Sequence, residues 1–313
     1  EIRRMGGAFG GKETQANHTA IWASLLAIKT GKPVKICLGR DDDQIMTGKR
    51  HRFLMRYEAG FTDDGLITYV DVEQNADAGS STDLSMAILE RAMMHAENAY
   101  YVPNIRIIGN AWFTNLPSNT AFRGFGGPQG MAVIEEIIDR IARKLGKDAR
   151  ELRKLNFYGI DERNEAPYGQ IVEKTLLHTL YDQLLETSEY EKRREEINAF
   201  NAENEFIKRG MALSPVKFGI SFTTSLLNQA GALAHIYKDG SVLINHGGTE
   251  MGQGLHTKIK DLAADELGLD PEQVKVNATS TAKVPNTSAT AASAGADLNG
   301  MAVKNALDKL KRR

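Results

Sequence analysis

Three glycine-rich segments, each followed by a stretch predicted to be helical, constrain the fold of this chain more than any other feature. They cover residues 6–11, 123–130 and 247–254. The apolar residues after the first two segments recur near the 3.6-residue period of an amphipathic helix. They are Ile21, Trp22, Leu25, Leu26 and Ile28, and then Met131, Ile134, Ile137, Ile138, Ile141 and Leu145. The third segment precedes a predicted helix that ends near residue 267.

A fourth segment has a similar place in the chain. Residues 286–300 are rich in Ser, Thr, Ala and Gly, and a helix is predicted over 301–310. Glycine tolerates positive φ and lets a ligand approach bare N–H groups, and a helix N-terminus carries partial positive charge. Several such loops therefore predict a cradle for an anionic cofactor, while the alternative is that they only make turns.

The first loop comes close to a phosphate-binding P-loop but departs from it at a decisive position. Gly6, Gly11 and Lys12 have the required spacing, but the next residue is Glu13, where the motif needs Ser or Thr to hold magnesium. No G-x-G-x-x-G dinucleotide fingerprint occurs in the three loops. The loops therefore do not favour a nucleotide-hydrolysing enzyme.

Composition excludes several classes of protein. The formal net charge is −1 over 313 residues, so no strong basic field attracts nucleic acid. No apolar run is long enough to span a bilayer. The single cysteine, Cys37, cannot build a Cys₄ zinc site or an iron–sulfur cluster. Cys37 lies in the apolar run 34–38, which predicts a buried thiol, and low cysteine use fits a reducing, cytoplasmic location.

The remaining pattern predicts an α+β fold. Strands are expected over 33–38, 52–59, 66–75, 104–112, 214–223 and 273–280. A hairpin is expected over 232–245, with Lys238, Asp239 and Gly240 as its turn. The charged stretch 189–206 predicts an exposed helix at a domain boundary. The chain begins at Glu1 and enters a glycine loop at once, so we expect an internal fragment.

The loop sequences resemble those of the molybdenum-cofactor domain of the xanthine dehydrogenase and oxidase family, in order and across essentially the whole chain. The resembling motifs are 4–14, 115–130, 217–223, 246–254, 284–288 and 296–300. The resemblance implies two mixed α/β subdomains with a molybdenum–molybdopterin cofactor between them. Residues 1–205 would be the C-terminal part of the first subdomain, and 206–313 the N-terminal part of the second.

The resemblance also implies cofactor contacts. The residues carried over by motif are Gly7, Phe9, Gly10, Arg123, Gln253, Ala292, Ser293 and Gly295. In this family the pterin dithiolene binds the molybdenum, so no protein side chain is expected to ligate the metal, although Phe9 and Arg123 would lie near it. Ala8 replaces a glycine usual in the first loop and would be strained only at positive φ. Gln15 stands where an arginine is common.

Substrate residues are implied in the same way. Glu13 and Arg91 match the catalytic pair that handles a purine, and their combination favours a purine over an aldehyde. Phe125 and Phe222 match two aromatics that hold the ring, and Thr223 matches a nearby hydroxyl. Each assignment has a structural alternative. Glu13 could favour a helix N-terminus by its charge, and Arg91 could form a surface ion pair. Phe125 and Phe222 could be core residues.

The implied parent enzyme oxidises hypoxanthine and xanthine to urate with water as oxygen source. It would pass electrons to iron–sulfur clusters, FAD and NAD on other domains or subunits, as a dimer of catalytic units. Alternatives are a related hydroxylase for another heterocycle or an aldehyde, and a non-catalytic cofactor-binding module. The family's general-base glutamate, in a Gly-x-Gly-Glu segment, has no counterpart here, so we expect no turnover by residues 1–313 alone.

Overall fold

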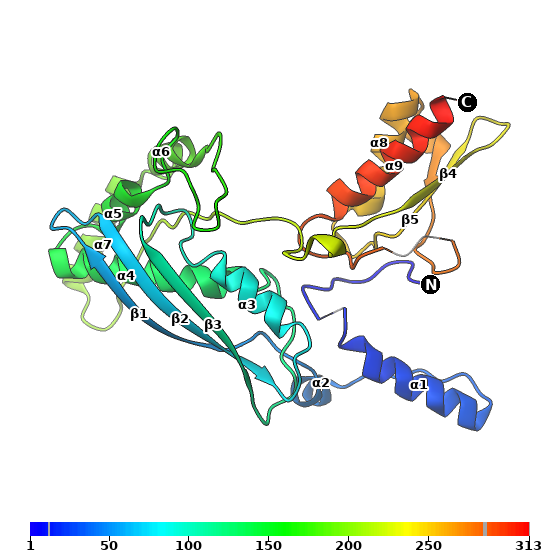
Figure 1. Cartoon of the computed structure of the whole chain (residues 1–313), viewed down its shortest axis with the longest axis horizontal. Coiled ribbons are helices and arrows are strands. Elements are labelled where there is room, and N and C mark those ends of the chain that lie inside the picture. Colours follow the sequence, from blue (N-terminus) through cyan, green and yellow to red (C-terminus); the bar gives the residue numbers. More distant parts are fainter. Residues whose placement is uncertain (12, 284–286, 313) are drawn as a thin grey trace. The chain divides into compact units, whose positions relative to one another are not determined.

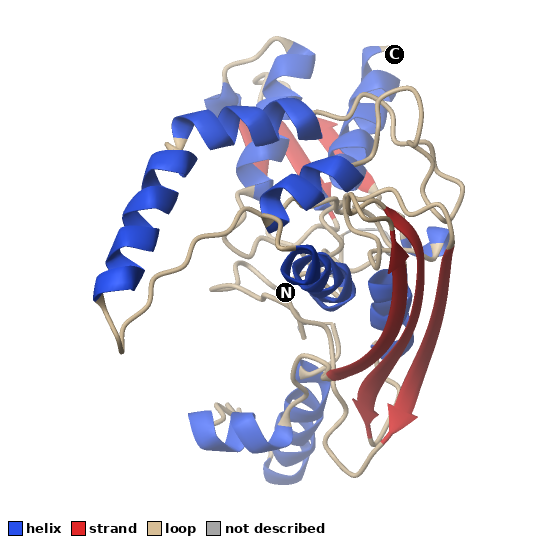
Figure 2. Ribbon diagram, turned by 90° about the vertical axis from the view of Figure 1, so that its left-hand side faces the viewer, coloured by secondary structure: helices blue, strands red, loops and turns tan. Residues whose placement is uncertain are grey.

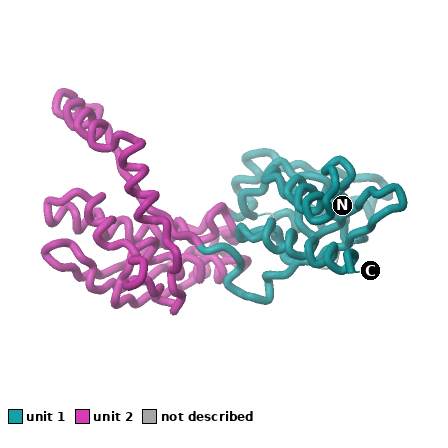
Figure 3. The backbone as a smooth tube through the Cα atoms, turned by 90° about the horizontal axis from the view of Figure 1, so that it is seen from above, with its two compact units in different colours: residues 1–48, 219–313 teal, residues 49–218 magenta. Residues whose placement is uncertain are grey.

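The chain divides into two compact units. The computed structural model describes residues 1–11, 13–283 and 287–312. Lys49–Phe218 form the central unit, and Glu1–Gly48 together with Gly219–Arg313 form the terminal unit (Figure 3). The boundary expected between residues 205 and 206 concerns the cofactor-binding subdomains and stays a prediction. Lys12 and residues 284–286, which belong to two of the motifs above, lie outside the described residues.

A three-stranded sheet forms the base of the central unit. Strands β1 (Phe53–Phe61), β2 (Ile67–Gly79) and β3 (Ile105–Phe113) lie in that order. β1 and β2 are antiparallel, whereas β2 and β3 are parallel and are joined through helix α3 (Ser85–Met93). The strands curve along their length (Figure 2). All three match strands that the sequence predicts.

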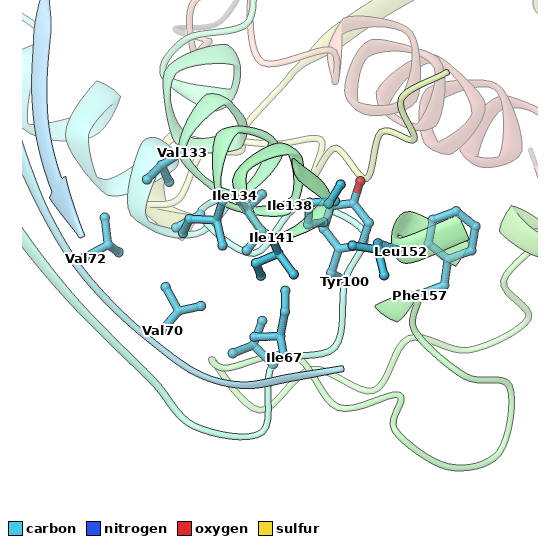
Figure 4. Close-up of a cluster of buried hydrophobic side chains, with 14 of the residues drawn as sticks. Ile67, Val70, Val72, Tyr100, Val133, Ile134, Ile138, Ile141, Leu152 and Phe157 are labelled. Atoms are coloured by element: carbon cyan, nitrogen blue, oxygen red, sulfur yellow. The ribbon is translucent and has the colours of Figure 1, made fainter. Parts of the chain in front are cut away.

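Helix α4 (Gly127–Leu145) supplies the other half of the central core. Its isoleucines have helical spacing and are almost fully buried, with Ile134 completely so. They pack against Val70 and Val72, which alternate on one face of β2 (Figure 4). Burial of such a side chain stabilises the fold by about 1.5–3 kcal/mol. Tyr100 and Phe157 close the end of this core.

Three further helices complete the central unit. They are α5 (Ala149–Asn156), α6 (Leu177–Thr187) and α7 (Tyr190–Glu203). Asp148 caps α5 by accepting a hydrogen bond from the Arg150 N–H at 2.8 Å. α7 has one buried residue, Tyr190, so the exposed helix expected over 189–206 is confirmed.

The terminal unit has a smaller sheet of the same kind. Strands β4 (Ala232–Ile236), β5 (Val242–His246) and β6 (Val274–Val276) lie in that order. The β4–β5 hairpin turns at Gly240, where φ is 84°, as the sequence predicts. β5 and β6 are parallel and are joined through helix α8 (Leu255–Leu267), and helix α9 (Gly295–Lys311) packs on α8.

The rest of the terminal unit consists of short or separate elements. Helices α1 (Ala16–Thr30) and α2 (Arg40–Met46) belong to its first segment. The 3₁₀ turns are η1 (Ser225–Leu227) and η2 (Pro271–Gln273). Its core joins Val242 and Ile244 of β5 to Ile259 of α8 and to Val303 and Leu307 of α9.

The two units share one topology, visible when their elements are followed in order in Figure 1. Each has an antiparallel hairpin, a crossover helix, a third strand parallel to the second, and a helix that follows this strand after a loop. The central unit follows β1, β2, α3, β3 and α4, and the terminal unit follows β4, β5, α8, β6 and α9. The α+β class with two mixed subdomains is therefore confirmed.

Two predicted strands are wrong. Residues 33–38 and 214–223 have no regular secondary structure, because within the described chain no neighbouring strand pairs with them. Cys37 is consequently exposed rather than buried. Helix α1 forms as expected, but its apolar residues remain exposed, including Leu25 at 53% and Ile28 at 80%. Among the described residues, no helix combines the length and apolar character needed to cross a membrane.

Candidate functional site

A pocket in the terminal unit brings four of the predicted cofactor residues together. Its volume is about 260 Å³, and the loop before α8 and the loop before α9 form its walls. It is lined by Met251, Gln253, Leu255, Lys258, Thr290, Ala291, Ala292, Ser293, Gly295 and Ala296. Gln253 therefore contributes to the same pocket as Ala292, Ser293 and Gly295, which are far from it in sequence.

The loop before α9 presents its backbone to this pocket. Ala292 and Ser293 both have φ of 56°, a left-handed conformation that costs non-glycine residues about 1–3 kcal/mol. Their side chains are small, so the main chain stays accessible. Ala294, the N-cap residue of the 17-residue helix α9, makes no side-chain capping bond. The positive end of α9 therefore opens at the pocket wall, where Lys258 adds a cationic group.

The segment with the predicted substrate residues is attached to this loop. The Ser221 N–H donates to the Ala292 carbonyl at 2.8 Å. Asn228 holds the next residue through both groups of its amide: Phe222 N–H donates to Asn228 Oδ1 at 2.9 Å, and Asn228 Nδ2 donates to the Phe222 carbonyl at 3.0 Å. Phe222 and Thr223 are half-buried, close in the chain to the residue that contacts Ala292.

The loop before α8 is closed by the carboxylate of Glu250, which is only 6% exposed. Glu250 accepts hydrogen bonds from the N–H groups of Gly252, Gly254 and His256, at 2.9, 3.1 and 2.9 Å. Burial by itself would raise the pKa of Glu250, but these donors outweigh it and hold the pKa below 4.5. Here the expectation of a helix terminus open to an external anion is corrected, because a side chain of the protein already occupies it.

The first glycine loop is joined to the same part of the terminal unit. Met5 N–H donates to the Glu250 carbonyl at 2.9 Å. Gly7 and Gly10 have φ of 124° and 115°, and Phe9 has φ of 49° with a ring that is 64% exposed. Ala8 does not have positive φ, so its replacement of glycine introduces no strain.

Glu13 and Gln15 lie in the turn before α1. Glu13 is half-buried there. Gln15, which stands where an arginine is common, accepts a hydrogen bond from the Gly48 N–H at 2.7 Å through its side-chain oxygen. Gln15 therefore ties the start of α1 to the end of the segment that contains α2.

In the central unit, Arg91 lies on α3 and is 5% exposed. Burial lowers the pKa of its guanidinium, although arginine keeps its charge at physiological pH. The guanidinium lies over the Phe218 ring, 5.5 Å from its centroid, and the His95 ring contacts Phe218 at 5.0 Å. Arg91 is thus a buried cation over an aromatic ring, and it does not lie at the surface as the alternative interpretation supposed.

The loop that carries Arg123 and Phe125 is pressed against α3. A Cβ on Gly126 would lie 2.0 Å from the Ile88 carbonyl oxygen, and one on Gly130 would lie 2.1 Å from that of Ala92. Only glycine permits this approach. Phe125 is half-buried with φ of 49°, and Arg123 is exposed, with its carbonyl accepting from Arg50 at 2.6 Å. The glycines therefore bring the Phe125 loop and the Arg91 helix into contact.

Sequence reasoning did not single out Phe218, Lys217 or Glu97, which support the Arg91 region. Lys217 and the fully buried Glu97 form an ion pair, and the Lys217 ammonium lies 4.8 Å from the Tyr158 ring centroid. Burial raises the pKa of Glu97, while Lys217 opposes that rise. The available signal for Lys217 and Phe218 was their place in the motif 217–223, whereas Glu97 lies in none of the motifs.

The predicted site residues are therefore divided between the units. Arg91, Arg123 and Phe125 belong to the central unit, and the others belong to the terminal unit. The terminal-unit residues are Gly7, Phe9, Gly10, Glu13, Phe222, Thr223, Gln253, Ala292, Ser293 and Gly295. Their individual roles stay predictions.

Comparison with known proteins identifies the family. A family described as "Molybdopterin cofactor-binding domain" matches residues 1–157, and a second family of the same description matches residues 183–313. The chain belongs to the molybdopterin cofactor-binding domain family. Both loops that form the terminal-unit pocket lie within the second match of this molybdopterin-binding chain.

Curated relatives of this molybdopterin-binding chain are xanthine dehydrogenases. Xanthine dehydrogenase 1 of Arabidopsis thaliana is 49% identical over 313 residues, and the xanthine dehydrogenase of Drosophila subobscura is 50% identical over 311. These matches cover 100% and 99% of this chain but 23% of each relative's length. The chain therefore spans about a quarter of the length of these relatives.

Solved structures agree on the fold. The aldehyde oxidoreductase from Desulfovibrio gigas matches with a TM-score of 0.77 and 27% identity, over 98% of this chain and 33% of that chain. The quinoline 2-oxidoreductase from Pseudomonas putida 86 matches with a TM-score of 0.82 and 24% identity, over 96% and 40%. At these identities the likeness establishes architecture and leaves the substrate to other arguments.

Proposed function

We propose that this chain is the molybdopterin-binding part of a purine hydroxylase of the xanthine dehydrogenase type. The observation that carries the proposal is the terminal-unit pocket, which gathers Gln253, Ala292, Ser293 and Gly295. Relatives named xanthine dehydrogenase at 49% and 50% identity support the substrate class. The iron–sulfur, FAD and NAD partners, the dimer of catalytic units and the cytoplasmic location stay predictions about the parent protein.

The chemistry of the pocket fits an anionic pterin. The positive end of α9, the accessible backbone of Ala292 and Ser293, and the ammonium group of Lys258 all favour negative charge. The Gln253 amide has two N–H donors, and one of them already bonds the Thr249 carbonyl at 2.9 Å. A bound molybdenum–pterin group would supply the two-electron oxidation, and the protein supplies position and electric field.

The substrate residues have distinct physical tasks in this proposal. Negative charge develops on an electron-poor ring during hydroxylation, and the buried guanidinium of Arg91 stabilises it. The Glu13 carboxyl group shares a proton with a ring nitrogen and orients the purine. Phe125 and Phe222 hold the flat ring, and Thr223 offers a hydroxyl.

Turnover by the molybdenum-loaded parent protein tests this function. We expect urate to form from xanthine much faster than benzaldehyde is oxidised. Arg91→Met should lower the rate on xanthine by about 10²-fold to 10³-fold, the usual effect of removing a transition-state donor. The matched control is Arg106→Met, which removes an exposed arginine of β3 that pairs with Asp71 at 2.9 Å.

The outcomes separate the alternatives. Faster oxidation of the aldehyde would keep the cofactor assignment and reject the purine. Equal rates for wild type and Arg91→Met would make Arg91 structural. Molybdenum-loaded protein that turns over neither substrate would favour another heterocycle or a non-catalytic module.

A further inference from the structure

Glu250 is a buried carboxylate that accepts hydrogen bonds from three main-chain N–H groups, two in the loop before α8 and one in the first turn of α8. One oxygen, Oε1, accepts from Gly252 and Gly254, and the other, Oε2, accepts from His256 at the start of α8. Charge-assisted bonds of this kind are about twice as strong as neutral ones. The residues between Glu250 and α8 are therefore folded around a single side chain.

This loop needs stabilising hydrogen bonds because its backbone conformation is unusual. Gly252 and Gly254 have φ of 98° and 77°, and a Cβ at either position would meet nothing within 4 Å. These glycines are thus needed for conformation and not for space. Glycine pairs are flexible in isolation, so the carboxylate bonds select one conformation for the segment that includes Gln253.

Glu250 and its neighbour Thr249 connect the Gln253 loop to two other loops of the terminal unit. The Glu250 carbonyl accepts from Met5 N–H at 2.9 Å, which joins the first glycine loop to this one. The preceding residue, Thr249, donates its N–H to Thr290 Oγ1 at 2.9 Å, which joins the loop before α9. Gln253 itself accepts from Met251 N–H at 2.6 Å. A substitution at Glu250 would therefore alter the pocket through several hydrogen bonds.

We propose that Glu250 is a positioning residue whose carboxylate holds the loop so that Gln253 faces the pocket and the molybdopterin is retained. The proposal rests on the proposed function, since the ligand is taken from it. A glutamine could not replace Glu250, because its NH₂ group would face either the His256 N–H or the two glycine N–H groups. Two donors would then oppose each other in a buried site.

The experiment uses the molybdenum-loaded parent protein and two measurements besides activity. Molybdenum and pterin content per chain reports retention, and hydrogen–deuterium exchange of the amides at 252, 254 and 256 reports the loop. Glu250→Gln should speed exchange at these amides by at least about tenfold, as expected for the loss of one charge-assisted bond. It should also lower the pterin content by more than half.

Two further variants make the test specific. Glu266→Gln is the matched control, because Glu266 lies at the far end of α8, the helix that follows the Glu250 loop, and pairs with Lys304 and Lys311. It should keep wild-type pterin content and loop exchange. Glu250→Asp keeps the charge with a shorter reach and should give intermediate pterin content, which keeps the test decisive if Glu250→Gln does not fold.

Each outcome decides the matter. Fast loop exchange with full pterin content in Glu250→Gln would mean that Glu250 only caps the helix, and it would overturn the proposal. Unchanged exchange and unchanged pterin content in Glu250→Gln would also overturn it. So would wild-type pterin content in Glu250→Asp. Wild-type protein without pterin would overturn the proposed function and the ligand named here. In that case the exchange data would still show whether Glu250 holds the loop.

Discussion

At the scale of single residues, Asn228 determines where the Phe222 backbone lies. Its amide both accepts from and donates to the main chain of Phe222. Asn228→Ala removes both bonds, each worth about 0.5–1.5 kcal/mol. We expect KM for xanthine to rise about tenfold in the parent enzyme, with a smaller change in kcat, because the ring is held less firmly. Steady-state kinetics measure both constants.

The neighbouring Gln229 provides the control for that prediction. Its side chain donates to the Leu226 carbonyl at 2.5 Å and does not contact Phe222 through any bond in the described structure. Gln229→Ala should leave KM unchanged. If Asn228→Ala and Gln229→Ala had the same effect on KM, substrate binding by Phe222 would not depend on the hydrogen bonds between its backbone and Asn228.

Residues of the site were predictable where a local motif names them, and not where a distant partner gives them their role. Gln253, Ala292 and Ser293 were predicted by motif, and the pocket gathers them. Glu250 and Asn228 were not predicted as support, because their roles come from hydrogen bonds that no sequence period reveals. Cys37 was misjudged for a related reason: an apolar run indicates burial only where another element covers it.

At the scale of elements, the contact between α3 and α4 depends on a glycine in α4. In Gly130→Ala, the new methyl group would lie 2.1 Å from the Ala92 carbonyl oxygen, so the helices must separate. Alanine is favoured over glycine in a helix by about 1 kcal/mol, but overpacking against backbone costs about 1–3 kcal/mol or more. We expect a net loss in the free energy of unfolding, measured by urea denaturation.

Gly210→Ala is the matched control for this contact. Gly210 lies in the same unit, has nothing within 4 Å of an added Cβ and does not have positive φ. Its substitution should change the free energy of unfolding by less than about 1 kcal/mol. A Gly130→Ala protein as stable as Gly210→Ala would mean that α3 can move away from α4 without loss.

Elements with a strong period or a turn signal were predicted well. The β4–β5 hairpin and helices α4 and α8 appear where the sequence places them. The strands predicted over 33–38 and 214–223 were wrong, because residues with high strand propensity form a strand only when a neighbouring strand supplies hydrogen bonds. Helix α3, which carries Arg91, was not predicted as an element. Its buried residues have helical spacing, but its nine residues are fewer than the roughly 11–18 over which such a period is read.

At the scale of the whole molecule, the shared topology of the two units was not visible in the sequence. The order of hairpin, crossover helix, parallel strand and following helix depends on pairing between distant segments. The glycine-loop-and-helix layout indicated part of it. In both units a non-glycine residue with positive φ precedes the helix after the third strand, Phe125 before α4 and Ser293 before α9. The repeated fold thus places a strained loop at the same topological position twice.

Burial lowers the pKa of a histidine to about 4 in each unit, at His95 in the central unit and at His246 in the terminal unit. Burial is the main cause, and nearby positive charge adds to it, from Arg91 and Lys217 at His95 and from His256 at His246. In the folded protein, both rings therefore stay neutral at pH values well below 6.5, the ordinary pKa of histidine. The unfolded chain binds protons first as the pH falls.

Stability should consequently decrease as the pH falls from about 6.5 towards 4, in both units. Each histidine contributes up to about 3 kcal/mol over this window, from 1.36 kcal/mol per pKa unit. Urea denaturation at pH 7.5, 5.5 and 4.5 measures the loss. His246→Asn should remove part of the pH dependence, whereas His235→Asn, at an exposed position of β4, should not. A free energy of unfolding with the same pH dependence in wild type and His246→Asn would show that His246 is not the group that titrates.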